Sequence, residues 1–179
     1  MRRTFVVGAV AGALALGAIG GAIAVQTRAG DPNRSSAKAI KQVKTTYGEN
    51  LVGTSTTAWV TVASIPMTIP SGESDLVIAR FDADTECGPT SPGVGSGVCQ
   101  LRFRAVKGSA HPLLLPESMS TVLRVETGGV GEDNATLTIE KSRVLGAGAW
   151  TIVVQHRVTD PSIYFGIYSH HLTVERAPV

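Results

Sequence analysis

Apolar and polar residues alternate with a period of two through most of the chain from Trp59 onward. This period matches a β-strand, in which successive side chains point to opposite faces, and no long run of helical period interrupts it. Turn signals such as Pro70-Ser71-Gly72 and Gly146-Ala147-Gly148 separate the alternating segments. The pattern predicts an all-β fold, a single antiparallel β-sandwich of two sheets and of jelly-roll type. The expected strands are Ala58–Ile65, Met67–Ile69, Asp75–Cys87, Val98–Val106, Thr121–Glu126, Ala135–Leu145, Ala149–Val158 and Ile163–Glu175.

Two of these strands carry the cysteines of the chain, Cys87 and Cys99. In both strands the odd positions are mostly apolar and the even positions mostly polar or charged, so each strand has one inner face, and each cysteine lies on it. A chain with only two cysteines and an export signal favours a disulfide between them. We expect this bond to close the charge-free loop 88–98 and to stabilise the fold by about 3 kcal/mol.

If Cys87 lay opposite Cys99 in an antiparallel pair, the rest of the register would follow. Phe81 and Phe103 would enter the core, each opposite an alanine. The outer face would carry two ion pairs, Asp84 with Arg102 and Asp82 with Arg104.

The last strand changes the side on which its apolar residues lie. Phe165 and Ile167 are at odd positions, whereas Leu172 and Val174 are at even ones. A β-bulge near Ser169 to His171 would produce this change.

The N-terminal region indicates export. Arg2 and Arg3 precede an uncharged run from Phe5 to Val25, and Ala22-Ile23-Ala24 matches a signal-peptidase site. The run is also long enough to span a bilayer, so residues 1–25 are either a cleaved signal peptide or an N-terminal membrane anchor. Both possibilities place the domain outside the cytoplasm, with membrane contact only through residues 5–25.

Residues 26–57 are polar and basic, and their composition predicts a linker before a domain at 58–179. The chain holds 16 Lys and Arg against 14 Asp and Glu, and removal of Arg2 and Arg3 makes the two counts equal. A neutral domain offers no general attraction for nucleic acid.

The sequence contains no pattern that predicts catalysis. Asp82, Asp84 and Glu86 could bind calcium from one strand face, but arginine partners are the simpler expectation. Neither a nucleophile elbow nor clustered metal ligands accompany the four histidines, so we expect no catalytic residues, no metal and no cofactor. A hydrolase triad assembled from distant strands stays open, because triads are spatial.

Candidate binding residues come from the last strand. Tyr164 and Tyr168 could stack on a sugar if they are exposed, and His171 lies on the same strand. The adjacent His170 should point to the opposite face, so the two histidines are a poor pair for one metal ion.

Several short motifs resemble a pattern found in uncharacterised secreted bacterial β-sandwich proteins. The resemblance covers most of 59–176 and implies an exported jelly-roll-like domain without an assigned activity; architecture of this kind is also similar to trimeric tumour-necrosis-factor-type domains. The motifs are Ile69-Pro70-x-Gly72, Arg80-Phe81, Cys87, Cys99-x-x-Arg102, Leu145-Gly146-Ala147-Gly148-x-Trp150-Thr151-Ile152-x-Val154-Gln155 and Leu172-Thr173-Val174-Glu175-Arg176.

These observations predict a non-enzymatic interaction module that is secreted or held at the cell envelope. Its partner would be a cell-wall polymer or another envelope protein. The alternatives are an extracytoplasmic hydrolase and a homotrimeric packing domain, which would need an exposed apolar sheet face.

Overall fold

The computed structural model describes residues 40–92, 95–112, 114, 120–125 and 133–179. These residues form strands and turns without a helix, and every strand pair is antiparallel. The expected all-β, antiparallel structure is confirmed, while residues 1–25 lie outside the described part. Among the residues described, none belongs to a helix with the length and apolar character needed to cross a membrane. The strands are β1 (Gln42–Gly48), β2 (Val52–Thr54), β3 (Val60–Pro89), β4 (Gly97–Val106), β5 (Ser120–Val125), β6 (Asp133–Val158) and β7 (Ile163–Pro178).

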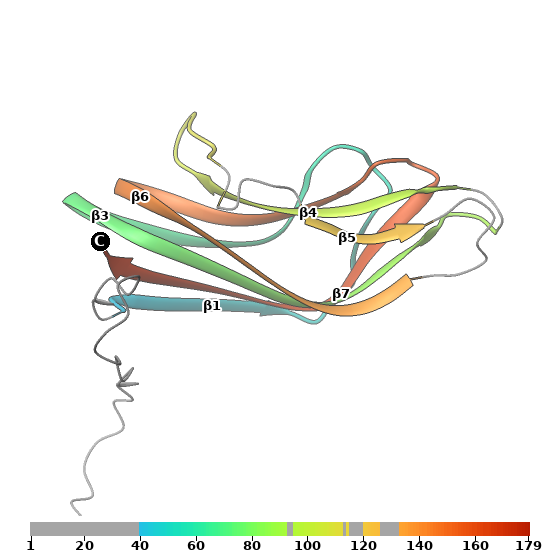
Figure 1. Ribbon diagram of the computed structural model, residues 1–179, viewed down its shortest axis with the longest axis horizontal. Helices are drawn as coiled ribbons and strands as arrows, with labels where there is room; N and C mark the ends of the chain where they lie inside the picture. Colours follow the sequence, from blue (N-terminus) through green and yellow to red (C-terminus); the bar gives the residue numbers. More distant parts are fainter. Residues whose placement is uncertain (1–39, 93–94, 113, 115–119, 126–132) are drawn as a thin grey trace, which may run out of the picture. The chain divides into compact units, whose positions relative to one another are not determined.

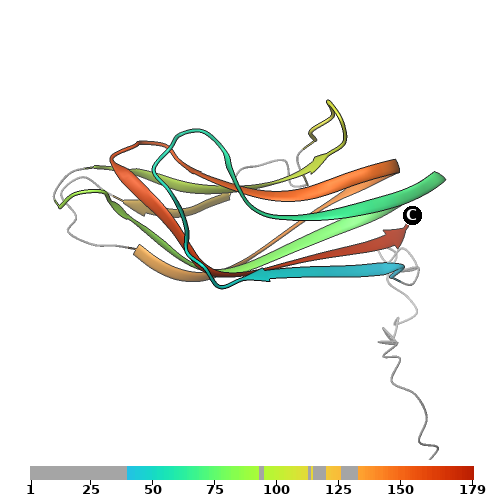
Figure 2. The same cartoon turned by 180° about the vertical axis from the view of Figure 1, so that it is seen from behind.

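The two longest strands, β3 and β6, pair with each other along almost their whole length. Their register shifts between Ile69 and Ser74, where β6 passes through Gly146 to Gly148. Gly72 and Gly148 have φ angles of 79° and 140°, which side chains other than glycine rarely adopt. At this point the pair doubles back on itself, as both views show (Figure 1, Figure 2). The sequence predicted separate strands before and after each of these two turn signals. In the structure they are the two halves of β3 and the two halves of β6.

This fold-over divides one continuous sheet into two facing layers. Layer A contains β1, β7, the second half of β3 (74–89) and the first half of β6 (133–146), with β2 also paired to β7. Layer B contains the first half of β3 (60–69), the second half of β6 (148–158), β4 and β5. The layers are thus joined by hydrogen-bonded strands and are not two separate sheets.

The core lies between the layers. Phe81 of layer A and Phe103 of layer B are 0% and 2% exposed, and their rings meet edge to face with centroids 6.5 Å apart. The expectation that both rings enter the core is confirmed. Each fully buried side chain of this size contributes about 1.5–3 kcal/mol through the hydrophobic effect.

The disulfide between Cys87 and Cys99 is present, and it connects the two layers. The Cα atoms are 6.1 Å apart, with Cys87 in β3 of layer A and Cys99 in β4 of layer B. The predicted hairpin register is nevertheless wrong, because β3 and β4 are not neighbours. Cys87 lies opposite Asp133 and Phe165 instead.

The predicted ion pairs are wrong for the same reason. Asp82 and Asp84 point outward from layer A, whereas Arg102 and Arg104 point outward from layer B. Alternation identifies the inner face of a strand but not the strand beside it. Two inner faces can meet across a core as well as within one sheet, so the cysteines fit both arrangements.

Part of the segment predicted as a linker belongs to the sheet. Residues 42–48 form β1, which pairs with β7 from Gln42 opposite Arg176 to Gly48 opposite His170, and residues 52–54 form β2. The linker boundary at 57 is therefore wrong, and residues 26–39 lie outside the described part. β1 is an edge strand with a polar sequence, which is common at sheet edges and resembles a linker in composition.

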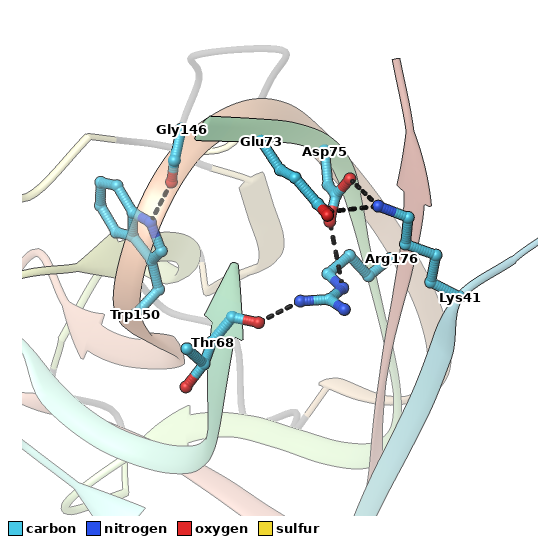
Figure 3. Close-up of polar contacts among 7 residues, drawn as sticks. All are labelled: Lys41, Thr68, Glu73, Asp75, Gly146, Trp150 and Arg176. Atoms are coloured by element: carbon cyan, nitrogen blue, oxygen red, sulfur yellow. Dashed lines mark hydrogen bonds and ion pairs between the residues drawn. The ribbon is translucent and has the colours of Figure 1, made fainter. Parts of the chain in front are cut away.

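A buried carboxylate fixes β1 and β7 near the fold-over (Figure 3). Asp75 is fully buried, and its oxygens lie 3.1 Å from Arg176 Nε and 3.3 Å from Lys41 Nζ. Lys41 also contacts Glu73, and Arg176 donates to the carbonyl of Thr68 in layer B. A buried charge requires such partners, so this network is structural.

The bulge expected in the last strand is confirmed. Ala83 lies opposite His170 and Thr85 opposite Ile167, so β7 has one residue more than β3 over this stretch. The extra residue falls at Tyr168-Ser169.

Candidate functional site

The outer face of layer A collects hydroxyl, phenol and carboxylate groups from four strands. Strand alternation places most of them there, because their neighbours along each strand point into the core, and the bulge in β7 adds one more. We call this surface the tyrosine–carboxylate face. It consists of Tyr47 from β1, Asp82, Asp84 and Glu86 from β3, Thr136 and Thr138 from β6, and Tyr164, Tyr168, Ser169 and His171 from β7.

Hydroxyl groups from both neighbouring strands donate to the aspartates. Thr138 Oγ1 lies 2.6 Å from Asp82 Oδ1, and Thr136 Oγ1 lies 2.6 Å from Asp84 Oδ1. Ser169 Oγ lies 2.7 Å from the other oxygen of Asp84. The hydrogen bond from Thr136, followed by that from Ser169, holds the pKa of Asp84 below its usual value. Asp84 is therefore a carboxylate, and an acceptor, at neutral pH.

Glu86 is the buried member of the face. Both Tyr164 and Tyr168 donate their hydroxyl groups to Glu86 Oε2, and the two phenol oxygens lie 3.1 Å apart. A carboxylate that is 6% exposed needs such donors to offset the loss of water.

The two tyrosines have different exposure. A Cβ atom on Gly166 would lie 2.7 Å from the hydroxyl oxygen of Tyr164, so only glycine there lets Tyr164 lie across the strand. The ring of Tyr164 also contacts the position of Gly53 in β2. Tyr164 is thus engaged in packing, whereas Tyr168 is 42% exposed and available to solvent.

The bulge in β7 determines how these side chains are presented. In a regular strand, Tyr168 and Ser169 would point to opposite faces. Across the bulge both reach outward carboxylates of β3, Tyr168 at Glu86 and Ser169 at Asp84. A bulge that redirects side chains in this way is frequent beside functional sites.

His171 and Tyr47 extend the face toward the sheet edge. They lie opposite each other in β7 and β1, both are exposed, and His171 lies opposite Asp82 on its other side. His170 instead stacks on Phe81 with ring centroids 5.7 Å apart, so the adjacent histidines separate as expected. Burial lowers the pKa of His170. The structure therefore brings the candidates Tyr164, Tyr168 and His171 onto one surface.

The described residues contain no group of three or more His, Cys, Asp or Glu side chains arranged to hold a metal ion. Within the same residues, no hydrogen bond links a histidine ring to a serine hydroxyl or to a carboxylate. What the tyrosine–carboxylate face provides is an exposed aromatic ring beside several acceptors and donors. These are the groups that a polyhydroxylated ligand requires.

Several residues of this face were not identified from the sequence as binding candidates. The outward direction of Glu86 was readable from alternation, but its tyrosine partners depend on β3 lying beside β7. The contact of Ser169 with Asp84 depends on the same pairing, and that of Thr136 depends on β3 lying beside β6. Tyr47 lies in the segment that composition assigned to a linker.

Comparison with known proteins gives no family. No family model matches the chain, and no curated protein matches it. Among solved structures, dimeric latent PorU from Porphyromonas gingivalis matches with a TM-score of 0.40 and 10% identity over 81% of this chain and 14% of that one. The structure of infectious bursal disease virus Gx strain matches with a TM-score of 0.30 and 8% identity, over 86% and 44% of the two chains. The chain thus spans less than half of either neighbour.

Proposed function

We propose that this protein is an extracytoplasmic, non-enzymatic interaction module, secreted or anchored at the cell envelope, with a jelly-roll-like sandwich as its scaffold. The disulfide supports an oxidising compartment, because such bonds persist mainly outside the cytoplasm. The folded-over β3–β6 pair supports the jelly-roll assignment. The N-terminal pattern at residues 1–25 supplies the export route.

The ligand we propose is a glycan, such as a cell-wall polymer, bound on the tyrosine–carboxylate face. The observation that carries this proposal is the bulge at Tyr168-Ser169, which sets the exposed ring of Tyr168 beside Glu86 and the hydroxyl of Ser169 on Asp84. Sugars bind proteins through an aromatic ring against their C–H face and acceptors for their hydroxyl groups. Because aspartate carboxylates line the face, neutral or amine-bearing sugars suit it better than acidic ones.

A glycan array and a pull-down with isolated cell-wall polymers test the proposal. Wild-type protein should retain a glycan, and Tyr168→Ala or Asp84→Asn should weaken binding by roughly 10-fold or more, as expected for losing a ring contact or a charged acceptor. Asp160→Asn is the matched control, because Asp160 also accepts a serine hydroxyl but lies in the β6–β7 turn. The proposal fails if no glycan binds, or if all three variants bind like the wild type.

The hydrolase and the homotrimer stay as alternatives. Turnover of ester or glycosidic substrates by the purified protein would favour the first. A trimer mass by light scattering would favour the second, and neither result depends on the glycan assay.

A further inference from the structure

The outer face of layer B carries three arginines, two of which contact one tryptophan. We call Trp59, Arg102, Arg104 and Arg157 the arginine cluster. Trp59 immediately precedes β3, Arg102 and Arg104 alternate along β4, and Arg157 lies in β6. The guanidinium carbons of Arg102 and Arg157 lie 4.1 and 4.5 Å from the centroid of the Trp59 ring. These are cation–π contacts, and they restrict the motion of two long side chains.

Two glutamines hold these guanidinium groups in place. Arg102 Nε donates to Gln155 Oε1 at 2.9 Å, and Arg157 Nε donates to Gln100 Oε1 at 2.9 Å. In each case the arginine and the glutamine lie opposite each other in β4 and β6, in two cross-strand pairs on the same face. Both guanidinium groups are therefore oriented by glutamine, and the neutral Gln155 leaves the charge of Arg102 uncompensated by this contact.

The electrostatic environment of Arg102 is positive. Burial, followed by the charges of Arg104 and Arg157, lowers the pKa of Arg102 to about 10. In the described part of the chain, neither Arg102 nor Arg104 forms an ion pair with a carboxylate. Apart from Arg157, the outward neighbours on β3 and β6 are uncharged: Thr61, Ser64, Thr151, Val153 and Gln155.

Arg102 also keeps hydrogen-bonding capacity. Its Nε atom is used by Gln155, but its two terminal nitrogens have no hydrogen-bond partner among the described residues. Two such nitrogens of a planar guanidinium match the two oxygens of a carboxylate or phosphate group. Arg104 differs, because both of its bonded nitrogens donate to the carbonyl of His111. It contributes charge next to Arg102.

We propose that the arginine cluster is a binding site for an oxyanion group, carboxylate or phosphate, carried by an anionic polymer. Arg102 supplies the hydrogen-bonding fork, Arg157 and Arg104 supply charge, and Trp59 with the two glutamines keeps the guanidinium groups in position. An anion at this point relieves the repulsion between Arg102 and Arg104, neither of which forms an ion pair with a carboxylate among the described residues. The site lies on the opposite layer from the tyrosine–carboxylate face and does not depend on the glycan proposal.

The test uses polyphosphate and polygalacturonate as separate probes, so that phosphate and carboxylate recognition are distinguished. Binding is followed by calorimetry at low and at physiological salt and by tryptophan fluorescence, because Trp59 contacts the arginines directly. Arg102→Gln removes the fork and one charge, and Arg102→Lys keeps the charge without the fork. Arg80→Gln is the matched control: it removes one charge from layer A, where Arg80 pairs with Glu140 at 2.6 Å.

At least one probe should bind and change the fluorescence, and the Trp59→Phe variant should lose that change. Arg102→Gln should weaken binding by about tenfold or more, Arg102→Lys should lie between it and the wild type, and Arg80→Gln should stay within about twofold. Arg104→Gln serves as the second variant if Arg102→Gln does not fold. The proposal is overturned if neither probe binds at low salt. The proposal is also overturned if Arg80→Gln loses as much affinity as Arg102→Gln, or as much as Arg104→Gln where that variant is used. Equal losses would indicate attraction by net charge alone.

Discussion

His156 gives the chain a predictable sensitivity to mild acid. Its side chain is 0% exposed on the inner face of layer B, and its ring lies 5.4 Å from that of Phe165. Neither ring nitrogen has a hydrogen-bond partner among the described residues. Burial lowers the pKa of His156 from 6.5 to about 4. We therefore consider the variant His156→Leu, which keeps a similar volume and removes the titrating group.

The size of the effect follows from the two pKa values. Above about pH 6.5 the ring is neutral in both folded and unfolded protein, so its titration does not change the free energy of unfolding. As the pH falls below 6.5, His156 becomes protonated in the unfolded chain but stays neutral in the folded core, so the free energy of unfolding decreases. With one pKa unit worth about 1.36 kcal/mol, the loss is about 2 kcal/mol at pH 5 and about 3 kcal/mol below pH 4.

Urea unfolding at about pH 7.5 and about pH 5 measures both parts of the prediction. At the higher pH, His156→Leu should match or exceed the wild type by up to about 3 kcal/mol, because two unpaired buried nitrogens are removed. Between the two pH values, its loss of stability should be smaller than that of the wild type by about 2 kcal/mol. The exposed His171→Gln variant should follow the wild type. Equal losses in His156→Leu and the wild type would refute the burial of a neutral, unpartnered ring.

Three further changes test the packing of the two layers. Replacing both Cys87 and Cys99 by serine should lower the unfolding free energy by about 3 kcal/mol, measured with denaturant and without reductant, since the loop spans 12 residues. Phe103→Ala should cost about 3–5 kcal/mol in the same assay, because the ring is buried at the centre of the core. Gly166→Ala should displace Tyr164 and lower the thermal midpoint, whereas an unchanged midpoint would mean that Tyr164 does not lie across the strand.

The parts of the fold that alternation encodes were predictable. A period of two specifies which side chains enter the core, so the burial of Phe81 and Phe103 and the shared inner face of the cysteines could be derived. The change of parity in the last strand likewise located the bulge. These are local properties, and each depends only on residues close together in sequence.

Strand partners were not predictable from the same pattern. Cys87 and Cys99 could meet either within a sheet or across a core, and the charge pattern of Asp82 and Arg104 suited the wrong choice. The fold-over of β3 and β6 is a property of two distant segments together, because each turn signal alone could equally end a strand.

The candidate site was predictable only in part. Tyr164 and Tyr168 could be identified as polar aromatics on one strand, but Asp84 and Glu86 join them only once β3 lies beside β7. The arginine cluster has a similar origin. Its local signal was the outward alternation of Arg102 and Arg104, and Arg157 and Trp59 join them through the pairing of β4, β6 and β3.

The most direct test of the proposed function is to locate a bound glycan by chemical-shift mapping on the labelled protein. The glycan with the highest affinity on the array should shift amide signals of Asp82 to Glu86 in β3 and of Tyr164 to His171 in β7. Signals from Gln100 to Arg104 in β4 should stay in place. Shifts confined to β4, or spread evenly over both layers, would contradict binding on the tyrosine–carboxylate face.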